Sequence, residues 1–230
     1  MSMSVNNIQT SRGGQAKQQL LEAALEIFGE SGLTGATTRE IALRAQQNIA
    51  AIAYYFGSKE GLYQAVAQYI TDTIKTEFTH LFKEIDDFFS SSVPDSPDNI
   101  LRMIHDGFLG VNRLMIEKES INISRIMARE QLAPTDAYTL IHEQALAPLH
   151  NRLNKLIACY IDADERQLST MLHTHALMGE IISFRMARET LLRQTGWNNI
   201  GPEEYKLIDQ ILIQHIDLLL NGLKKHNSNK

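Results

Sequence analysis

Hydrophobic residues recur every three to four positions through most of this chain, which is the spacing that places side chains on one face of an α-helix. Polar stretches rich in Ser, Pro, Asn and Gly interrupt the pattern at residues 90–98 and 195–201 and predict loops. The pattern predicts helices over about residues 14–31, 38–45, 49–55, 59–89, 99–116, 121–131, 135–161, 164–192 and 202–223. No internal repeat is present, and the predicted fold class is all-α.

At 230 residues the chain can form one large domain or two small ones, and we expect two. Residues 1–12 form a flexible polar tail, residues 13–62 a small domain of short helices, and residues 63–230 a larger helical domain. Helix 59–89 keeps one apolar stripe and can tie the two domains together. We expect a bend at Pro148 and a helix cap at Asp164.

The last two long helices, 164–192 and 202–223, are apolar on more than one side. Such a helix must bury two faces. One face can pack on its own subunit and the other on a second copy, which predicts a homodimer joined by a four-helix interface. The alternative is that both helices lie inside a monomer.

The segment from Thr37 to Lys59 is the most specific part of the sequence. Thr37 and Glu40 form a capping box that begins a two-turn helix. Gln46, Gln47 and Asn48 make a turn, and Asn48 can cap the second helix. The order of helix, tight turn and short second helix is that of a helix-turn-helix, which places the second helix in the DNA major groove.

This segment closely resembles the DNA-binding domain of the TetR family of bacterial repressors, and the resemblance covers about residues 14–65. It is carried by Thr37, Arg39-Glu40-Ile41-Ala42, Ala45, Tyr54-Tyr55-Phe56-Gly57-Ser58-Lys59-Glu60 and Leu62. Gln46 stands where the family usually has a glycine, which predicts a strained left-handed backbone. Ala53 stands where the family often has an aromatic residue. The remainder of the chain has a fainter resemblance to the CecR-like branch of the family.

The resemblance implies a fold and a function. The fold is an N-terminal three-helix helix-turn-helix domain followed by a larger helical domain for effector binding and dimerisation. The function is that of a homodimeric transcriptional regulator that acts as a repressor and binds double-stranded DNA at a palindromic operator. A small-molecule effector in the C-terminal domain modulates this binding by changing the spacing of the two heads.

Candidate DNA contacts follow from the chemistry of the segment and from the resemblance. Five side chains suit phosphate contacts: Thr37, Thr38, Tyr54, Tyr55 and Lys59. Others lie where the family approaches base edges: Arg39, Asn48, Ile49, Ala50 and Ala51. Arg39 can read guanine, and the short apolar side chains can meet thymine methyl groups. The alternative roles are capping and packing. Arg12 and Lys17 suit the DNA backbone and a solvated tail equally well.

The net charge of −5 at first sight opposes DNA binding, but its distribution matters more. Residues 1–63 hold equal numbers of basic and acidic side chains, so the surplus acid lies after Tyr63. A neutral domain can bind DNA if its cations face the phosphates and its acids face away. The balance predicts modest non-specific affinity.

The termini, the single cysteine and the motifs of the sequence bear on cellular location and on whether the protein is an enzyme. The N-terminus lacks an apolar signal core, no apolar run reaches the length of a membrane span, and Cys159 is the single cysteine, so we expect a cytoplasmic protein without membrane association. Cys159 reads as a small core residue rather than a redox sensor. No catalytic constellation or phosphate-binding glycine loop occurs, so we expect neither an enzyme nor a cofactor.

Polar residues in the apolar C-terminal helices are candidates for an effector pocket: Arg125, Arg129, His175, Glu180 and Arg185. Interhelix salt bridges explain the same residues equally well. A metal site is not expected, because His173 and His175 point apart on a helix. Two rival functions remain open at this stage: a helical ligand-binding or enzymatic protein without DNA activity, and an interaction scaffold.

Overall fold

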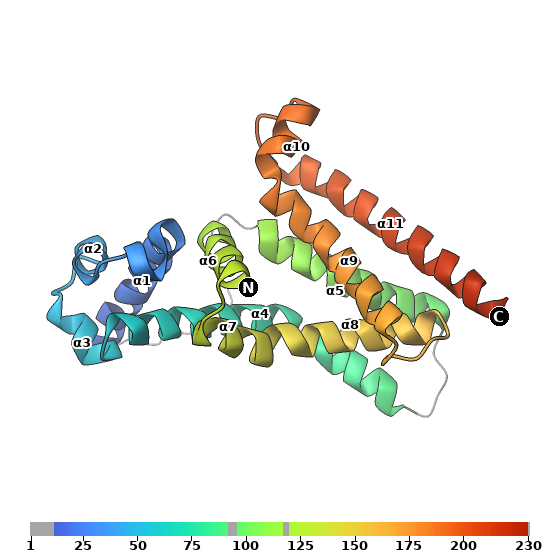
Figure 1. Ribbon diagram of the computed structural model, residues 1–230, viewed down its shortest axis with the longest axis horizontal. Helices are drawn as coiled ribbons and strands as arrows, with labels where there is room; N and C mark the ends of the chain where they lie inside the picture. Colours follow the sequence, from blue (N-terminus) through green and yellow to red (C-terminus); the bar gives the residue numbers. More distant parts are fainter. Residues whose placement is uncertain (1–11, 92–95, 117–119, 230) are drawn as a thin grey trace, which may run out of the picture. The chain divides into compact units, whose positions relative to one another are not determined.

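The computed structural model describes residues 12–91, 96–116 and 120–229 (Figure 1). Every regular element in these ranges is a helix, as the periodicity predicts. The expected N-terminal tail lies outside the described residues except for Arg12, which begins the first helix. None of the helices in these ranges is long and apolar enough to cross a membrane.

The chain divides into two compact units, and each unit is built from two separate segments of the sequence. Unit 1 comprises residues 1–70 and 121–141, and unit 2 comprises residues 71–120 and 142–230. The long helix α4 (Lys59–Ser90) contributes its first part to unit 1 and the remainder to unit 2. A segment from the middle of the sequence is therefore part of the N-terminal unit.

Unit 1 contains α1 (Arg12–Gly35), α2 (Thr38–Arg44), α3 (Ala50–Phe56) and the start of α4. Helix α1 breaks at Gly32, where a φ of 70° favours glycine over residues with a side chain. The core is made of side chains that are at most 2% exposed: Leu20, Ala24, Phe28, Ile41, Ile52, Leu62, Val66, Ala67 and Ile70. This apolar contact holds the short helices, which are too short to be stable alone.

Helices α6 (Ser120–Leu132) and α7 (Asp136–Ile141) complete unit 1. Gly29 of α1 allows a close approach to α6, because an added Cβ there would lie 2.6 Å from Cβ of Asn122. Thr135 accepts a hydrogen bond from the backbone N–H of Ala137 (3.2 Å) and so caps α7.

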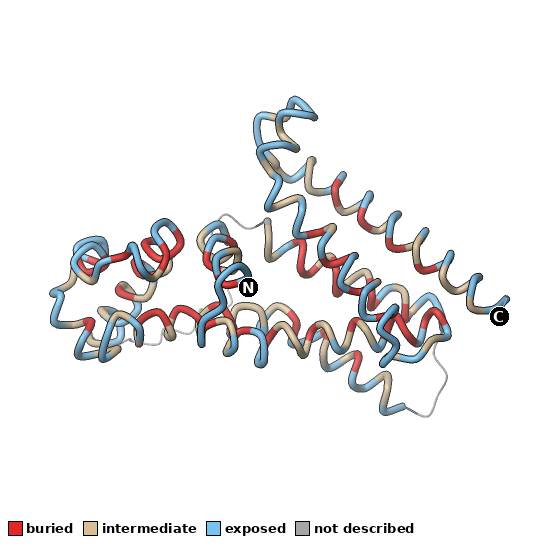
Figure 2. Tube along the Cα trace, viewed as in Figure 1, coloured by how far each residue is buried: buried red, intermediate tan, exposed pale blue. Residues whose placement is uncertain are grey.

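Unit 2 is a helical bundle built from the second part of α4 and from α5 (Pro97–Ile116), α8 (Ala147–Tyr160), α9 (Leu168–Met186), α10 (Arg188–Thr195) and α11 (Pro202–Ser228). Its core lies along the inward faces of these helices (Figure 2). Two polar pairs join α5 to α11. Nδ2 of Asn112 donates to Asp209 (2.7 Å), and Nε2 of His105 lies 2.8 Å from Oδ1 of Asp217.

Four local predictions need correction. Cys159, expected in the core, is exposed on α8. The chain departs from a straight helix before Pro148, in a π-helix (His142–Leu146), and Pro148 lies in the first turn of α8, directly after it. Helix α9 begins at Leu168, so Asp164 does not cap it; its carboxylate accepts from the N–H of Arg166 (2.8 Å). The expected helix 164–192 is also two helices, α9 and α10, separated at Ala187.

Candidate nucleic-acid interface

Helix α2 begins with the capping box that the sequence predicts. The N–H of Glu40 donates to Oγ1 of Thr37 (3.2 Å), and Oε2 of Glu40 accepts from the N–H of Thr37 (3.0 Å) and from its hydroxyl (2.7 Å). These hydrogen bonds lower the pKa of Glu40, because they favour its charged form. Thr37 is therefore occupied in fixing the start of α2, although its side chain is exposed.

The turn between α2 and α3 contains the strained residue that the sequence predicts. Gln46 has a φ of 53°, in the left-handed region that disfavours residues with a side chain. The N–H of Gln47 donates to the carbonyl of Ala42 (2.9 Å) and closes the turn. The side chain of Asn48 then accepts from the N–H of Ala50 (2.8 Å), which supports the first turn of α3.

Helix α3 buries one face and leaves the opposite face open. Ile52 is 2% exposed and packs inward, whereas Ile49 is 50% and Tyr54 is 82% exposed. Ala50 and Ala53 are exposed as well, and Ala51 is partly buried. The open face of α3 therefore carries Ile49, Ala50, Ala53 and Tyr54, and short side chains make up half of it.

The two tyrosines at the end of α3 differ in environment. Tyr55 is partly buried, and its ring makes edge contacts with Tyr54 (centroids 4.9 Å apart) and Phe56 (6.4 Å). Its ring therefore helps to hold Tyr54, whose hydroxyl can reach a phosphate more freely. Tyr55 serves mainly in packing, which is the alternative role that the sequence left open.

Lys59 has a structural role that the sequence did not reveal. Its Nζ donates to the carbonyls of Leu33 (2.9 Å) and Ala36 (3.1 Å), at the end of α1. An ammonium group has three donors, so one remains for a phosphate. Ser58 accepts from the N–H of Gly61 (3.0 Å) and caps α4 beside it.

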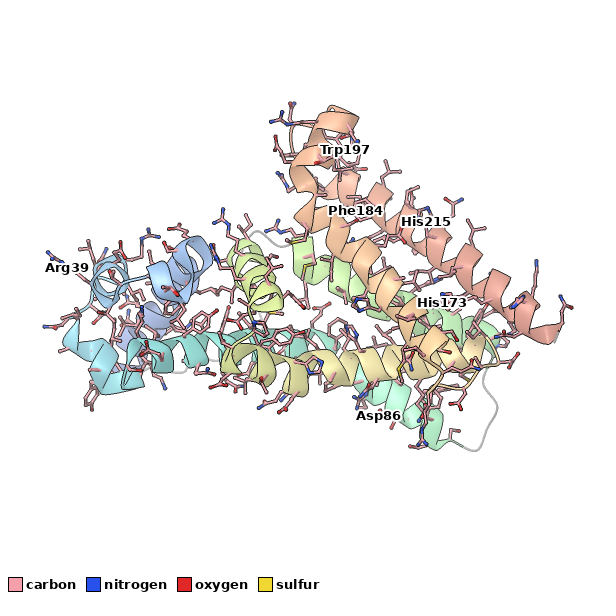
Figure 3. The ribbon with its side chains drawn as sticks, in the orientation of Figure 1. Arg39, Asp86, His173, Phe184, Trp197 and His215 are labelled. Carbon is pink, nitrogen blue, oxygen red and sulfur yellow. The ribbon has the colours of Figure 1, made fainter. Side chains whose placement is uncertain are left out.

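Two arginines on α2 are both exposed but differ in their partners. Arg44 forms an ion pair with Glu26 of α1. Arg39 projects away from α2 (Figure 3), and it forms no hydrogen bond or ion pair with any residue that the structure describes. Thr38 beside it is partly buried, and Lys17 of α1 lies over the ring of Phe56 (5.8 Å). Arg39 is therefore the cation of α2 that is available to a ligand.

Comparisons with known proteins identify the family of this chain. Residues 20–66 match the family described as bacterial regulatory proteins, tetR family, and residues 97–223 match the C-terminal domain of the HTH-type transcriptional dual regulator CecR. The chain is 46% identical over 222 residues to the protein of that name from Shigella flexneri, covering 96% of this chain and 99% of that protein. The chain belongs to the TetR family of bacterial transcriptional regulators. It is CecR-like and DNA-binding, and the proteins it matches are regulators, not enzymes.

Solved structures of other transcriptional regulators share this fold. The hemolysin II regulator HlyIIR superposes with a TM-score of 0.56 at 20% identity, over 92% of this chain and 98% of that chain. The TetR-family regulator PfmR from Thermus thermophilus gives 0.56 at 13% identity, over 88% and 97%. Among shorter matches, the repressor NicS from Pseudomonas putida is 33% identical over 63 residues, 27% of this chain and 30% of that protein.

The five candidate pocket residues fall in different units of this TetR-family chain. Arg125 and Arg129 lie on α6 in unit 1, whereas His175, Glu180 and Arg185 lie on α9 in unit 2. Glu180 pairs with His215 of α11, and the exposed His175 lies near His150 (ring centroids 6.4 Å apart). No group of three or more His, Cys, Asp or Glu side chains suited to a metal ion occurs in the described part of the chain.

Arg129 has a structural role within unit 1. Its guanidinium donates to three backbone carbonyls of α1, those of Phe28 (3.2 Å), Gly29 (2.7 Å) and Glu30 (2.8 Å). Carbonyls near a helix end lack partners within the helix, so a guanidinium is well placed to satisfy them. Arg129 thus fastens α6 to α1 within unit 1.

Glu130 is a structural residue that sequence reasoning missed. It is 3% exposed, and its carboxylate accepts from the hydroxyl of Tyr63 on α4 (2.7 Å) and from the N–H (2.9 Å) and hydroxyl of Thr135. Burial, followed by this hydrogen bond and the carboxylate charge, raises the pKa of Tyr63 well above its usual range. The only sequence signal was a charged residue among the apolar positions of helix 121–131.

Proposed function

We propose that this TetR-family protein binds a palindromic double-stranded operator as a homodimer in the cytoplasm, represses transcription there, and releases DNA when a small molecule binds its C-terminal domain. Each subunit inserts α3 into one major groove, at half-sites about one helical turn (~34 Å) apart. The observation that carries the proposal is the open face of α3, beside the exposed Arg39, on a helix fixed from behind by Ile52.

Roles for the individual residues follow from their exposure. Arg39 reads a base edge, and Ile49, Ala50 and Ala51 offer apolar contacts to thymine methyl groups. Tyr54 donates to a phosphate, and Thr38 and the remaining donor of Lys59 contact phosphates near it. Thr37, Asn48 and Tyr55 act chiefly by holding the two helices in shape, with their outer atoms available to the backbone of DNA. Sparse base contacts leave a share of the specificity to DNA shape.

The exposed apolar residues of α9 and α11 support the homodimer. They include Leu168, Met171, Leu172, Ile182 and Met186 of α9, and Leu207, Ile211 and Leu218 of α11. Each is at least 37% exposed in the single chain, and so large an apolar surface on two neighbouring helices is typical of an interface. A two-fold pair of these helices forms the four-helix interface.

A gel-shift experiment with the DNA that flanks the protein's own gene tests the DNA-binding claim. Retarded migration that survives competitor DNA supports it, and its absence at micromolar protein counts against it. Sedimentation equilibrium tests the dimer with Leu218→Glu, which we expect to dissociate it. The control is Leu132→Glu in unit 1, because Leu132 is 88% exposed but lies on α6. A wild-type monomer would refute the dimer.

Repression is tested with a reporter gene under the bound promoter. Deletion of the regulator should raise expression. The relative from Shigella flexneri is described as a dual regulator, so a fall in expression at some promoters is the alternative outcome.

A further inference from the structure

Helix α6 holds α1 at the point where α1 departs from a regular helix. Gly32 of α1 is buried, and its φ of 70° and ψ of 175° are not helical. The first part of α1 therefore ends just before this residue, where the last carbonyls of a helix need partners from outside it. Figure 1 shows α6 beside α1 within unit 1.

The side chain of Arg129 occupies this helix end in two ways. Its guanidinium donates to the carbonyls of Phe28, Gly29 and Glu30, and it forms no salt bridge with the described residues. The carbonyl end of a helix is the negative end of its dipole, so it suits a cation. The stem of the same side chain lies against Gly32, because a Cβ added there would be 3.3 Å from Cδ of Arg129.

The chain continues from Gly32 directly into α2. The N–H of Ala36 donates to the carbonyl of Gly32 (3.1 Å), and Ala36 is 1% exposed. The next residue, Thr37, is the N-cap of α2, and the exposed Arg39 follows two positions later. The direction of the backbone at Gly32 therefore sets where α2 begins and where Arg39 lies.

Two cations fix this turn of the backbone from different helices. Lys59 at the start of α4 binds the carbonyls of Leu33 and Ala36, which follow Gly32. Arg129 of α6 binds the carbonyls that precede it. Loss of Arg129 would leave the turn anchored by its second half, with the end of the first part of α1 released from α6.

We propose that Arg129 is a positioning residue for DNA recognition: it holds the end of α1 at Gly32 and so sets the placement of α2 and Arg39, without touching DNA itself. Arginine suits this role because its planar fork presents several donors in fixed directions. A lysine at this position would offer a point charge on a flexible stem and hold the turn less rigidly. The inference rests on the proposed function, in which Arg39 reads a base edge.

Fluorescence anisotropy on a sequence selected from random DNA by the wild-type chain tests the inference. Arg129→Met keeps an apolar stem over Gly32 but removes the donors. It should bind about tenfold more weakly, because a recognition site depends on the residues that hold it in its productive geometry. The matched control is Arg125→Met, since Arg125 is exposed on the same helix and forms no hydrogen bond or ion pair within the described ranges. It should bind as wild type does.

Circular dichroism at the assay temperature confirms that each variant is folded. Arg129→Lys retains the charge and should bind with intermediate affinity, and it replaces Arg129→Met in these tests if that variant does not fold. Wild-type affinity of the Arg129 variants, or an equal loss in Arg125→Met, overturns the inference.

A double-mutant cycle separates positioning from an independent contact with DNA. If Arg129 acts through α2, Arg39→Ala should weaken binding by Arg129→Met by a smaller factor than it weakens binding by wild type. Equal factors would show that the two arginines act independently, and they would overturn the inference.

Hydrogen exchange followed by mass spectrometry tests the turn without DNA. In Arg129→Met the amides of residues 31–38 should exchange about tenfold faster than in wild type, because the turn opens locally. The amides of residues 50–56 in α3 should change less. Equal acceleration of both segments, or none, overturns the inference. Absence of DNA binding by the wild type refutes the proposed function, whereas the exchange result judges the hold of Arg129 on the turn by itself.

Discussion

Replacing Tyr63 by Phe tests whether α6 is an integral part of the DNA-binding unit. The substitution removes only the hydroxyl, so the edge contact of the ring with Phe28 (centroids 4.9 Å apart) is preserved. It leaves the buried carboxylate of Glu130 without a donor on α4. A hydrogen bond to a charged group contributes about 1.5–3 kcal/mol. Because Thr135 still donates to Glu130, we expect the free energy of unfolding to fall by about 2 kcal/mol.

Urea unfolding followed by circular dichroism measures this loss as a lower midpoint at unchanged slope. Tyr160→Phe is the matched control, because Tyr160 is also buried but donates to the neutral amide oxygen of Asn221 (2.9 Å). Loss of a neutral hydrogen bond costs about 0.5–1.5 kcal/mol, less than the first. An unchanged midpoint for Tyr63→Phe, or a loss no greater than that of the control, would refute the role of the Tyr63–Glu130 contact.

The pH dependence of folding stability tests the Tyr63–Glu130 contact in a second way. The folded pKa of Tyr63 is raised above its unfolded value of about 10, so its stabilising contribution is complete below pH 10. Above that pH the unfolded state releases a proton that the folded state retains, and stability falls by up to about 1.4 kcal/mol per pH unit. Tyr63→Phe should show a shallower fall between pH 10 and 11 than wild type. Parallel curves would contradict the assignment.

Three further substitutions follow from unit 1. Lys59→Ala should lower the melting temperature, because two carbonyls at the end of α1 lose their donor. If the third donor meets a phosphate, the same variant should also reduce the slope of log affinity for DNA against log salt concentration by about 1. An unchanged slope would show that Lys59 is a structural residue only. Gly29→Ala should destabilise by about 1–3 kcal/mol in thermal unfolding, because its Cβ would lie 2.6 Å from Asn122. Gln46→Gly should raise stability by up to about 1 kcal/mol by relieving its positive φ; a loss would show that the turn tolerates Gln without strain.

Local signals in the sequence predicted most of the DNA-binding unit. The capping box, the left-handed Gln46 and the outward residues of α3 depend on neighbours within a few positions, which the sequence shows directly. It was harder to predict which residues of α1 face the core. Leu20, Leu21, Leu25 and Ile27 are all apolar, but the structure leaves Leu21 and Leu25 partly buried and places Leu20 and Ile27 in the core.

Contacts between distant segments could not be predicted. Arg129 lies about a hundred positions from the carbonyls it binds, and nothing in its own helix distinguishes it from a solvated arginine or a pocket residue. The same holds for Glu130 and Tyr63, 67 positions apart. Helix α9 ends at Met186 and α10 begins at Arg188, a break that the continuous apolar pattern of the sequence conceals.

The central claim is that α2 and α3 present a sequence-reading surface to DNA. Selection of bound sequences from random DNA, followed by fluorescence anisotropy on the winning sequence, tests it most directly with Arg39→Ala and the matched Arg44→Ala, whose side chain already pairs with Glu26. The account predicts a palindrome that Arg39→Ala binds about 1–3 kcal/mol more weakly, with relaxed preference at one base of each half-site. Arg44→Ala should bind nearly as wild type does. Failure to enrich any sequence, or equal binding by all three proteins, would contradict the claim.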